Sequence, residues 1–150
     1  MLDAILAILH HLLAFGLFAI IAAELVIISP GLDAQRLRRA GIIDLHYGLM
    51  AVLMLLVGFT RAIYAAKGWS YYAHNAFFWA KLGTFALIGL LSILPTLRIL
   101  RWRRALRQDP QAPPAAAEIT RVRRVLWLEL ALAVLLPIFA ALMARGYGEW

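Results

Sequence analysis

The sequence predicts an all-α integral membrane protein, a four-helix bundle that forms a single domain over residues 1–150. Of its 150 residues, 64% are hydrophobic and 15% are charged, whereas a soluble domain is about half apolar and about a quarter charged. The apolar residues gather in four runs, each close to the ~20 residues that a helix needs to cross a bilayer. Basic residues flank these runs, as topology signals do in membrane proteins.

The first two runs are separated by a short basic segment. The first predicted span covers about residues 4–29 and stops at a helix-breaking Pro-Gly pair. It carries His10 and Glu24 and no basic leader, so we predict a retained helix rather than a signal peptide. After the connector GLDAQRLRRAG, the second span covers about residues 44–64.

Two further runs complete the predicted bundle. The loop AAKGWSYYAHN has the Trp and Tyr content of an interfacial aromatic belt, and it precedes the third span, about residues 76–99. The segment QDPQAPPAAA is rich in Pro and Ala, so we expect a mobile linker over about residues 108–117. The fourth span covers about residues 125–144.

The distribution of arginine predicts the orientation in the membrane. The first and third connectors carry most of the basic residues, namely Arg36, Arg38, Arg39, Arg98, Arg101, Arg103, Arg104, Arg107, Arg121, Arg123 and Arg124. Basic connectors face the cytoplasm, so both termini are expected on the outer, periplasmic side of a bacterial inner membrane. We also expect these connectors to contact anionic lipids. Because the arginines lie beside apolar spans, the net charge of +7 does not indicate nucleic-acid binding.

The composition narrows the chemistry that is available to the protein. The chain has no cysteine, which excludes disulfides, thiolate metal sites, iron–sulfur clusters and covalent attachment of c-type haem. Ligands for a metal or cofactor must come from His, Lys, Met, Tyr or a carboxylate. The sequence contains no glycine-rich nucleotide-binding motif and no nucleophile–base signature.

Ionisable residues within the spans fall at two depths. At ~1.5 Å per helical residue, His10, Arg61 and Lys81 each lie about 9 Å to the outer side of their span centres. Glu24 and Glu129 lie toward the inner side. The outer level therefore collects a histidine and two cations with no acid among them. This imbalance predicts a missing anion, such as the carboxylate of a cofactor.

Helical periodicity predicts which of these side chains face the bundle. At ~100° per residue, His10 and Glu24 are about 40° apart, whereas His11 points about 100° away from His10. A glutamate within a membrane helix is expected to face the interior, which places His10 inside as well. Only His11 and His74 are other imidazoles on the outer side, so a bis-histidine haem within one bundle is not expected.

Each candidate side chain has two interpretations. His10 is either an axial ligand of haem iron or a hydrogen-bonded structural histidine, and His11 is a second candidate ligand. Lys81 and Arg61 either bind the carboxylates of a cofactor or extend to the outer headgroups. In the first case Lys81 could also act in acid–base catalysis. For Glu24, Glu129 and Asp44, we expect ion pairs with connector arginines; the alternative is a proton path from the inner side.

Three stretches resemble known proteins. LHHLLAFGLFAIIAAEL, DLHYGL and GFTRAIYAAKGWSYYAHNAFFWAKLGTFALIGLLSILPTLRILRWRRAL resemble the bacterial membrane protein family known as domain of unknown function 2214, which has no assigned activity. The layout is also similar to the HemJ-type protoporphyrinogen oxidases, small four-helix membrane proteins with outward termini that are associated with b-type haem. This second resemblance implies that His10 and Lys81 occupy the places of an essential His in the first helix and an essential Lys in the third.

The leading hypothesis is a membrane protein that binds haem b or another porphyrin and acts as an oxidoreductase. His10 would be the iron ligand and would act in catalysis with Lys81, while His11 and Arg61 would be further cofactor-binding residues. One alternative is a cofactor-free transporter of a small solute, an ion or protons that uses the buried acids. Another is an accessory subunit of a larger membrane complex. The substrate, the electron acceptor and a homo-oligomeric state are left open.

Overall fold

The protein is all-α, as predicted. The computed structural model describes residues 1–64, 67–109 and 113–150. Within these residues the chain forms α1 (Leu2–Ile27), α2 (Ala34–Tyr64), α3 (Gly68–Ala73), α4 (Ala76–Gln108) and α5 (Ala116–Ala144). Helices α1, α2, α4 and α5 are each long and apolar enough to cross a membrane, which confirms the four predicted spans.

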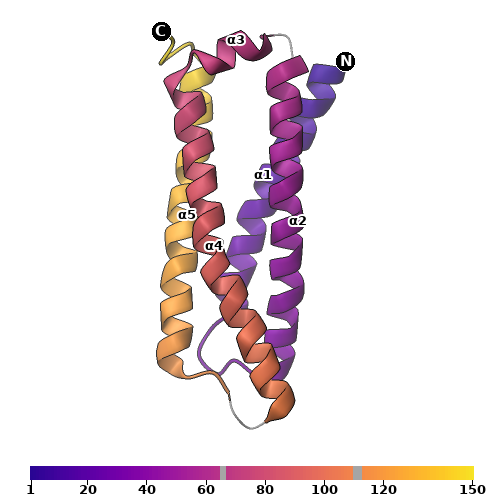
Figure 1. The fold of residues 1–150 in the computed structure, drawn as a ribbon, viewed down its shortest axis with the longest axis vertical. Coiled ribbons are helices and arrows are strands. Elements are labelled where there is room, and N and C mark those ends of the chain that lie inside the picture. Colours follow the sequence, from indigo (N-terminus) through magenta and orange to yellow (C-terminus); the bar gives the residue numbers. More distant parts are fainter. Residues whose placement is uncertain (65–66, 110–112) are drawn as a thin grey trace.

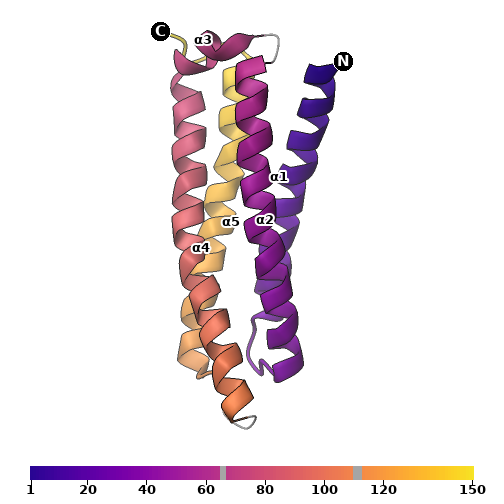
Figure 2. The same cartoon turned by 45° about the vertical axis from the view of Figure 1, so that its right-hand side comes forward.

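The four long helices run alternately up and down the bundle (Figure 1). Helix α1 packs mainly on α2, and α4 packs mainly on α5, so the bundle consists of two helical pairs. Both chain termini lie at the same end, and α3 lies across that end between the two pairs (Figures 1 and 2). We call this the terminal end. The opposite end, where α1 joins α2 and α4 joins α5, is the arginine-rich end.

At the arginine-rich end the helices are longer than the predicted spans. Helix α2 begins at Ala34 instead of residue 44, so the first basic connector is largely helical. Helix α4 ends at Gln108 instead of residue 99, and α5 begins at Ala116 instead of residue 125. Of the expected linker 108–117, residue 108 and residues 116–117 are helical, and residues 110–112 lie outside the described residues.

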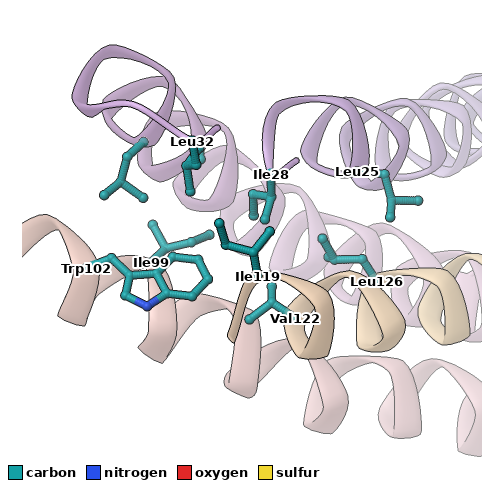
Figure 3. Packing of buried hydrophobic residues seen from close by; sticks show 10 residues of the cluster. Leu25, Ile28, Leu32, Ile99, Trp102, Ile119, Val122 and Leu126 are labelled. Atoms are coloured by element: carbon teal, nitrogen blue, oxygen red, sulfur yellow. The ribbon is translucent and has the colours of Figure 1, made fainter. Parts of the chain in front are cut away.

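The extensions form because their apolar residues recur at helical spacing and are buried together. Figure 3 shows this cluster, in which side chains from α1, the α1–α2 connection, α4 and α5 converge. Its buried members are Leu25, Ile28, Leu32, Leu37, Ala40, Ile99, Trp102, Ile119, Val122 and Leu126. The indole nitrogen of Trp102 donates to Glu118 Oε2 at 2.8 Å, and Arg98 forms an ion pair with Glu118 at 2.5 Å. Tertiary packing therefore continues the helices beyond the most apolar part of each run.

A second apolar cluster fills the middle of the bundle. Its buried members are Leu17, Ile21, Tyr47, Met54, Ile88 and Ala133. Gly16 allows a close approach here, because a Cβ at this position would lie 2.2 Å from the terminal carbon of Met50. On α1 the cluster reaches Leu13 toward the terminal end, so it stops just short of His10.

The outer faces of the long helices are apolar. Large side chains such as Leu12, Phe15, Leu56 and Leu90 are exposed, with 60% or more of their surface accessible. In a soluble protein such large apolar faces would promote aggregation, whereas in a membrane they are covered by lipid chains. The exposed faces are consistent with contact between these helices and the bilayer.

Asn75 closes the terminal end. The loop predicted between the second and third spans contains the short helix α3, and the Tyr71 hydroxyl donates to Met143 O at 2.8 Å. Asn75 is fully buried; its Oδ1 accepts from the N–H groups of Phe77 and Phe78, which caps α4. Its Nδ2 donates to Tyr147 O at 3.0 Å, so one side chain ties the start of α4 to the C-terminal tail.

Replacement of Asn75 by Ala should destabilise the terminal end. The change removes the cap of α4 and leaves the carbonyl of Tyr147 without its donor, so we expect a loss of about 1–3 kcal/mol of unfolding free energy. Thermal melting of helical circular dichroism in detergent measures the effect. His74→Ala is the matched control, because the His74 side chain is exposed and bonds only to its own helix turn. Equal melting temperatures for the two variants would contradict the role of Asn75.

Candidate functional site

Polar side chains enter the bundle at two levels. Near the terminal end, α1 contributes His10, α2 contributes Arg61 and α4 contributes Lys81; we call these three residues the basic layer. Toward the arginine-rich end, Glu24, Asp44, Tyr47 and Glu129 come from α1, α2 and α5; we call them the acidic layer. On α1 the two levels are separated by the 14 residues from His10 to Glu24, about 21 Å at ~1.5 Å per residue.

His10 points toward α2, as its helical face predicts. A Cβ on Gly58 would lie 3.4 Å from His10 Cε1 and 3.7 Å from Nδ1, so the imidazole lies directly over this glycine. The Nδ1 atom is buried and has no hydrogen-bond partner among the described residues. Buried polar nitrogens in proteins are nearly always hydrogen-bonded. An unpartnered imidazole nitrogen is therefore available to a ligand.

Lys81 and Arg61 lie close enough to His10, and to each other, for their charges to interact. The Lys81 ammonium is 5.8 Å from the centroid of the Phe78 ring, and no described carboxylate forms an ion pair with it. Arg61, in contrast, has an acidic partner, because its Nε lies 3.6 Å from Asp3 Oδ1. The expectation of a level without any acid was thus wrong for Arg61. Lys81 remains the cation whose partner the described residues do not supply.

The other three histidines face away from the basic layer. His11, His46 and His74 are exposed, and the Nδ1 of each lies 2.6–2.9 Å from the carbonyl oxygen four residues earlier. The His11 ring is 6.3 Å from the His10 ring and nearly perpendicular to it. His10 therefore enters the bundle without a second imidazole, as its spacing from His11 predicts.

The acidic layer is buried more deeply than the basic layer. Glu24 and Glu129 are 3% and 1% exposed, and one carboxylate oxygen of each is buried without a hydrogen-bond partner in the described part of the chain. Asp44 acts on both glutamates electrostatically, and its Oδ1 accepts a hydrogen bond from Thr96 of α4 at 2.6 Å. Tyr47, three residues after Asp44 on α2, is buried at the same level. All four long helices thus contribute polar groups to this level.

The predicted pairing of these acids with connector arginines is wrong. Among the described residues, Glu24, Asp44 and Glu129 form no ion pair with an arginine, whereas Arg61 pairs with Asp3 and Arg98 pairs with Glu118. Arg123 instead donates to the carbonyl oxygens of Leu25 and Ile28. Arg36 likewise donates to Val26 O, Gly31 O and the Ser29 hydroxyl. These arginines satisfy free carbonyls at the end of α1, which a helix terminus always presents, and are therefore not available to the glutamates.

Sequence reasoning missed that Asp44 and Tyr47 belong to the same level as the glutamates. Two signals could have shown it. Asp44 and Tyr47 are three residues apart on α2, and Ser92 and Thr96 are four residues apart on α4, so each pair shares one helix face. Among the described residues, no group of three or more His, Asp or Glu side chains is arranged to hold a metal ion.

Comparison with known proteins gives a family but no characterised relative. The family model described as "Predicted membrane protein (DUF2214)" matches residues 2–148, nearly the whole chain. No curated protein and no solved structure matches the chain. The four apolar helices agree with this family description. The chain therefore belongs to the DUF2214 family of predicted membrane proteins, and it is a multi-pass membrane protein.

Proposed function

We propose that the basic layer binds haem b or a related porphyrin and that the protein acts as an oxidoreductase in a bacterial inner membrane. The observation that carries this proposal is the buried, unpartnered Nδ1 of His10 beside Lys81, a cation without an ion-pair partner among the described residues. A carboxylate-bearing tetrapyrrole would satisfy both groups at once. The resemblance to HemJ-type protoporphyrinogen oxidases suggests a porphyrinogen as the first substrate to test.

The residues of the basic layer have the chemistry that a haem requires. An imidazole nitrogen is the commonest protein ligand of haem iron, and His10 would supply it. Lys81 would bind one propionate and Arg61 would bind the other. Arg61 would either give up its contact with Asp3 or keep it. Bound haem would supply one-electron transfer. Lys81 would also hold or move a proton beside a bound porphyrinogen, and His10 would do so only when it is not bound to iron.

Within one bundle, His10 would be the histidine that holds the haem. His11 is exposed on the outer face of α1 and bonds to Ala7 O, so it would ligate a haem only at the surface, between two protomers. A haem held by His10 inside one bundle would not need His11, whereas haem binding between two protomers would depend on it.

The arginine-rich end would lie in the cytoplasm and contact anionic lipid. The basic side chains concentrate there, and the cytoplasmic side of membrane proteins carries such an excess. A cavity of about 180 Å³ opens between α2 and α4; it is lined by Ala34, Leu37, Arg38, Arg103, Leu106 and Arg107. Three guanidinium groups beside apolar side chains fit the headgroup and the upper acyl chain of an anionic phospholipid.

An absorption spectrum of the purified protein tests the proposed cofactor. We expect a Soret band, either as purified or after reconstitution with haem, with a shift of the visible bands on reduction. His10→Ala should abolish the ligand-dependent spectrum. Lys81→Gln should weaken haem binding about tenfold, the effect of losing one charged hydrogen bond. Absence of any Soret band after reconstitution would contradict the proposal.

Exposed histidines provide the matched controls for this spectrum. His46→Ala changes an exposed histidine on α2 that bonds only to Ile42 O, so it should leave the spectrum unchanged. His11→Ala should also leave it unchanged if the haem lies within one bundle. A His10→Ala protein that keeps the wild-type spectrum would rule out His10 as the ligand.

Vesicle binding or native mass spectrometry tests the contact with anionic lipid. We expect the wild-type protein to retain phosphatidylglycerol in preference to phosphatidylcholine. Replacing Arg103 and Arg107 by Gln should reduce this preference, by about 1 kcal/mol or roughly fivefold for each arginine. Arg145→Gln changes a basic residue beyond the end of α5, at the terminal end, and should have no effect. Equal retention of both lipids by the wild-type protein would contradict the assignment.

A further inference from the structure

The acidic layer lies between two apolar clusters. The cluster at the arginine-rich end includes Leu25 and Leu126, which follow Glu24 and precede Glu129 closely in sequence. The mid-bundle cluster includes Ile21 and Ala133 on the other side of the same glutamates. Both glutamates are more than nine-tenths buried. Packed apolar side chains therefore flank the layer on both sides along the bundle axis.

No described cation neutralises these acids. Helix α2 contributes Asp44 and Tyr47, α4 contributes hydroxyl groups only, and α5 contributes Glu129. Arg123, on the same helix as Glu129, donates instead to the carbonyl oxygens of Leu25 and Ile28. An ionised carboxylate without a partner costs several kcal/mol in a protein interior and more within a membrane. Two such carboxylates facing a third cannot all be ionised.

We propose that the acidic layer is a proton-binding site in which Glu24 and Glu129 carry exchangeable protons. A bound proton removes the charge of a buried carboxylate and turns one of its oxygens into a donor. The unpartnered oxygens of the two glutamates, together with the Asp44 carboxylate and the Tyr47 hydroxyl, provide the groups between which such protons would be shared. This site is distinct from the basic layer and does not depend on a tetrapyrrole.

The structure also suggests the side from which protons enter. Glu24 lies three residues before the end of α1 at Ile27, whereas the terminal end is about 33 Å away at ~1.5 Å per residue. A cavity of about 400 Å³ opens between α1 and α5 beside this level; it is lined by Ala22, Leu25, Val26, Ser29, Arg123, Trp127 and Leu130. Its lining includes Ser29 and Arg123, and both belong to the arginine-rich end. Exchange is therefore expected with the water at that end.

A hydrophobic carbodiimide tests the proposal directly. Such reagents reach carboxyl groups from the lipid phase and react with the protonated form. The cavity between α1 and α5 is lined by Leu25 and Leu130, the sequence neighbours of the two glutamates. The wild-type protein in liposomes is treated with dicyclohexylcarbodiimide over a range of pH, and adducts are located by peptide mass spectrometry. We expect adducts on Glu24 or Glu129 at neutral pH. At high pH, labelling should fall about tenfold per pH unit as the protonated fraction declines.

The wild-type chain contains its own control. Glu118 is partly exposed and paired with Arg98, so it should remain unlabelled. Glu24→Gln and Glu129→Gln should each remove the adduct at the changed position and leave the absorption spectrum of the basic layer unaffected. Because the main result comes from the wild-type protein, it does not depend on the folding of either variant.

Two outcomes would overturn the proposal. The first is the absence of adducts on both glutamates at every pH, in liposomes and in detergent. The second is protection of the glutamates by sodium ions at constant pH, which would show that the site binds a monovalent cation instead of protons. A protein that lacks a Soret band but is labelled at Glu24 or Glu129 would retain the proton site and lose only the proposed cofactor.

Discussion

The structure depends on the requirement that a membrane-spanning chain satisfies its polar groups internally. Lipid supplies no hydrogen bonds, so the backbone forms helices and the ionisable side chains turn toward the bundle interior. Here the helices pair as α1 with α2 and α4 with α5, and their outward faces are apolar. The free carbonyls at the end of α1 are covered by Arg36 and Arg123. These contacts occupy the arginines that would otherwise neutralise the buried acids.

The separation of charge into two levels follows from this arrangement. At the arginine-rich end, the side chain of Arg123 donates to backbone carbonyl oxygens instead of pairing with an acid. Glu24 and Glu129 are therefore left without a cation. Near the terminal end, Arg61 is paired with Asp3, and Lys81 lacks an acidic partner among the described residues. The mid-bundle apolar cluster keeps the levels apart, so the surplus cation and the surplus acids cannot neutralise one another. We therefore propose that each level has a partner of its own: an anion for the basic layer and protons for the acidic layer.

The sequence predicted the class of fold, the four spans and the inward direction of His10. The first two follow from the length of the apolar runs, and the third follows from the periodicity of an α-helix. It did not predict the helical extensions, since residues such as Leu37, Ile99 and Val122 are buried by contacts between helices that are distant in sequence. The pairing of Arg61 with Asp3 was missed for the same reason. The sequence led us to pair Glu24, Glu129 and Asp44 with connector arginines, because the number and position of charges can be read from it. It does not show that backbone carbonyl oxygens at the end of α1 bind those arginines instead.

His10 lies inside the bundle against α2, where we propose that it binds a ligand, whereas His11 lies outside. The chain has no cysteine, so two single positions can be labelled without any background. A protein carrying His10→Cys and Gly58→Cys should be cross-linked within one chain by a short thiol-specific reagent, because the His10 ring lies 3.4 Å from a Cβ at position 58. A protein carrying His11→Cys and Gly58→Cys should not. Efficient cross-linking of the second pair, with none of the first, would contradict the account.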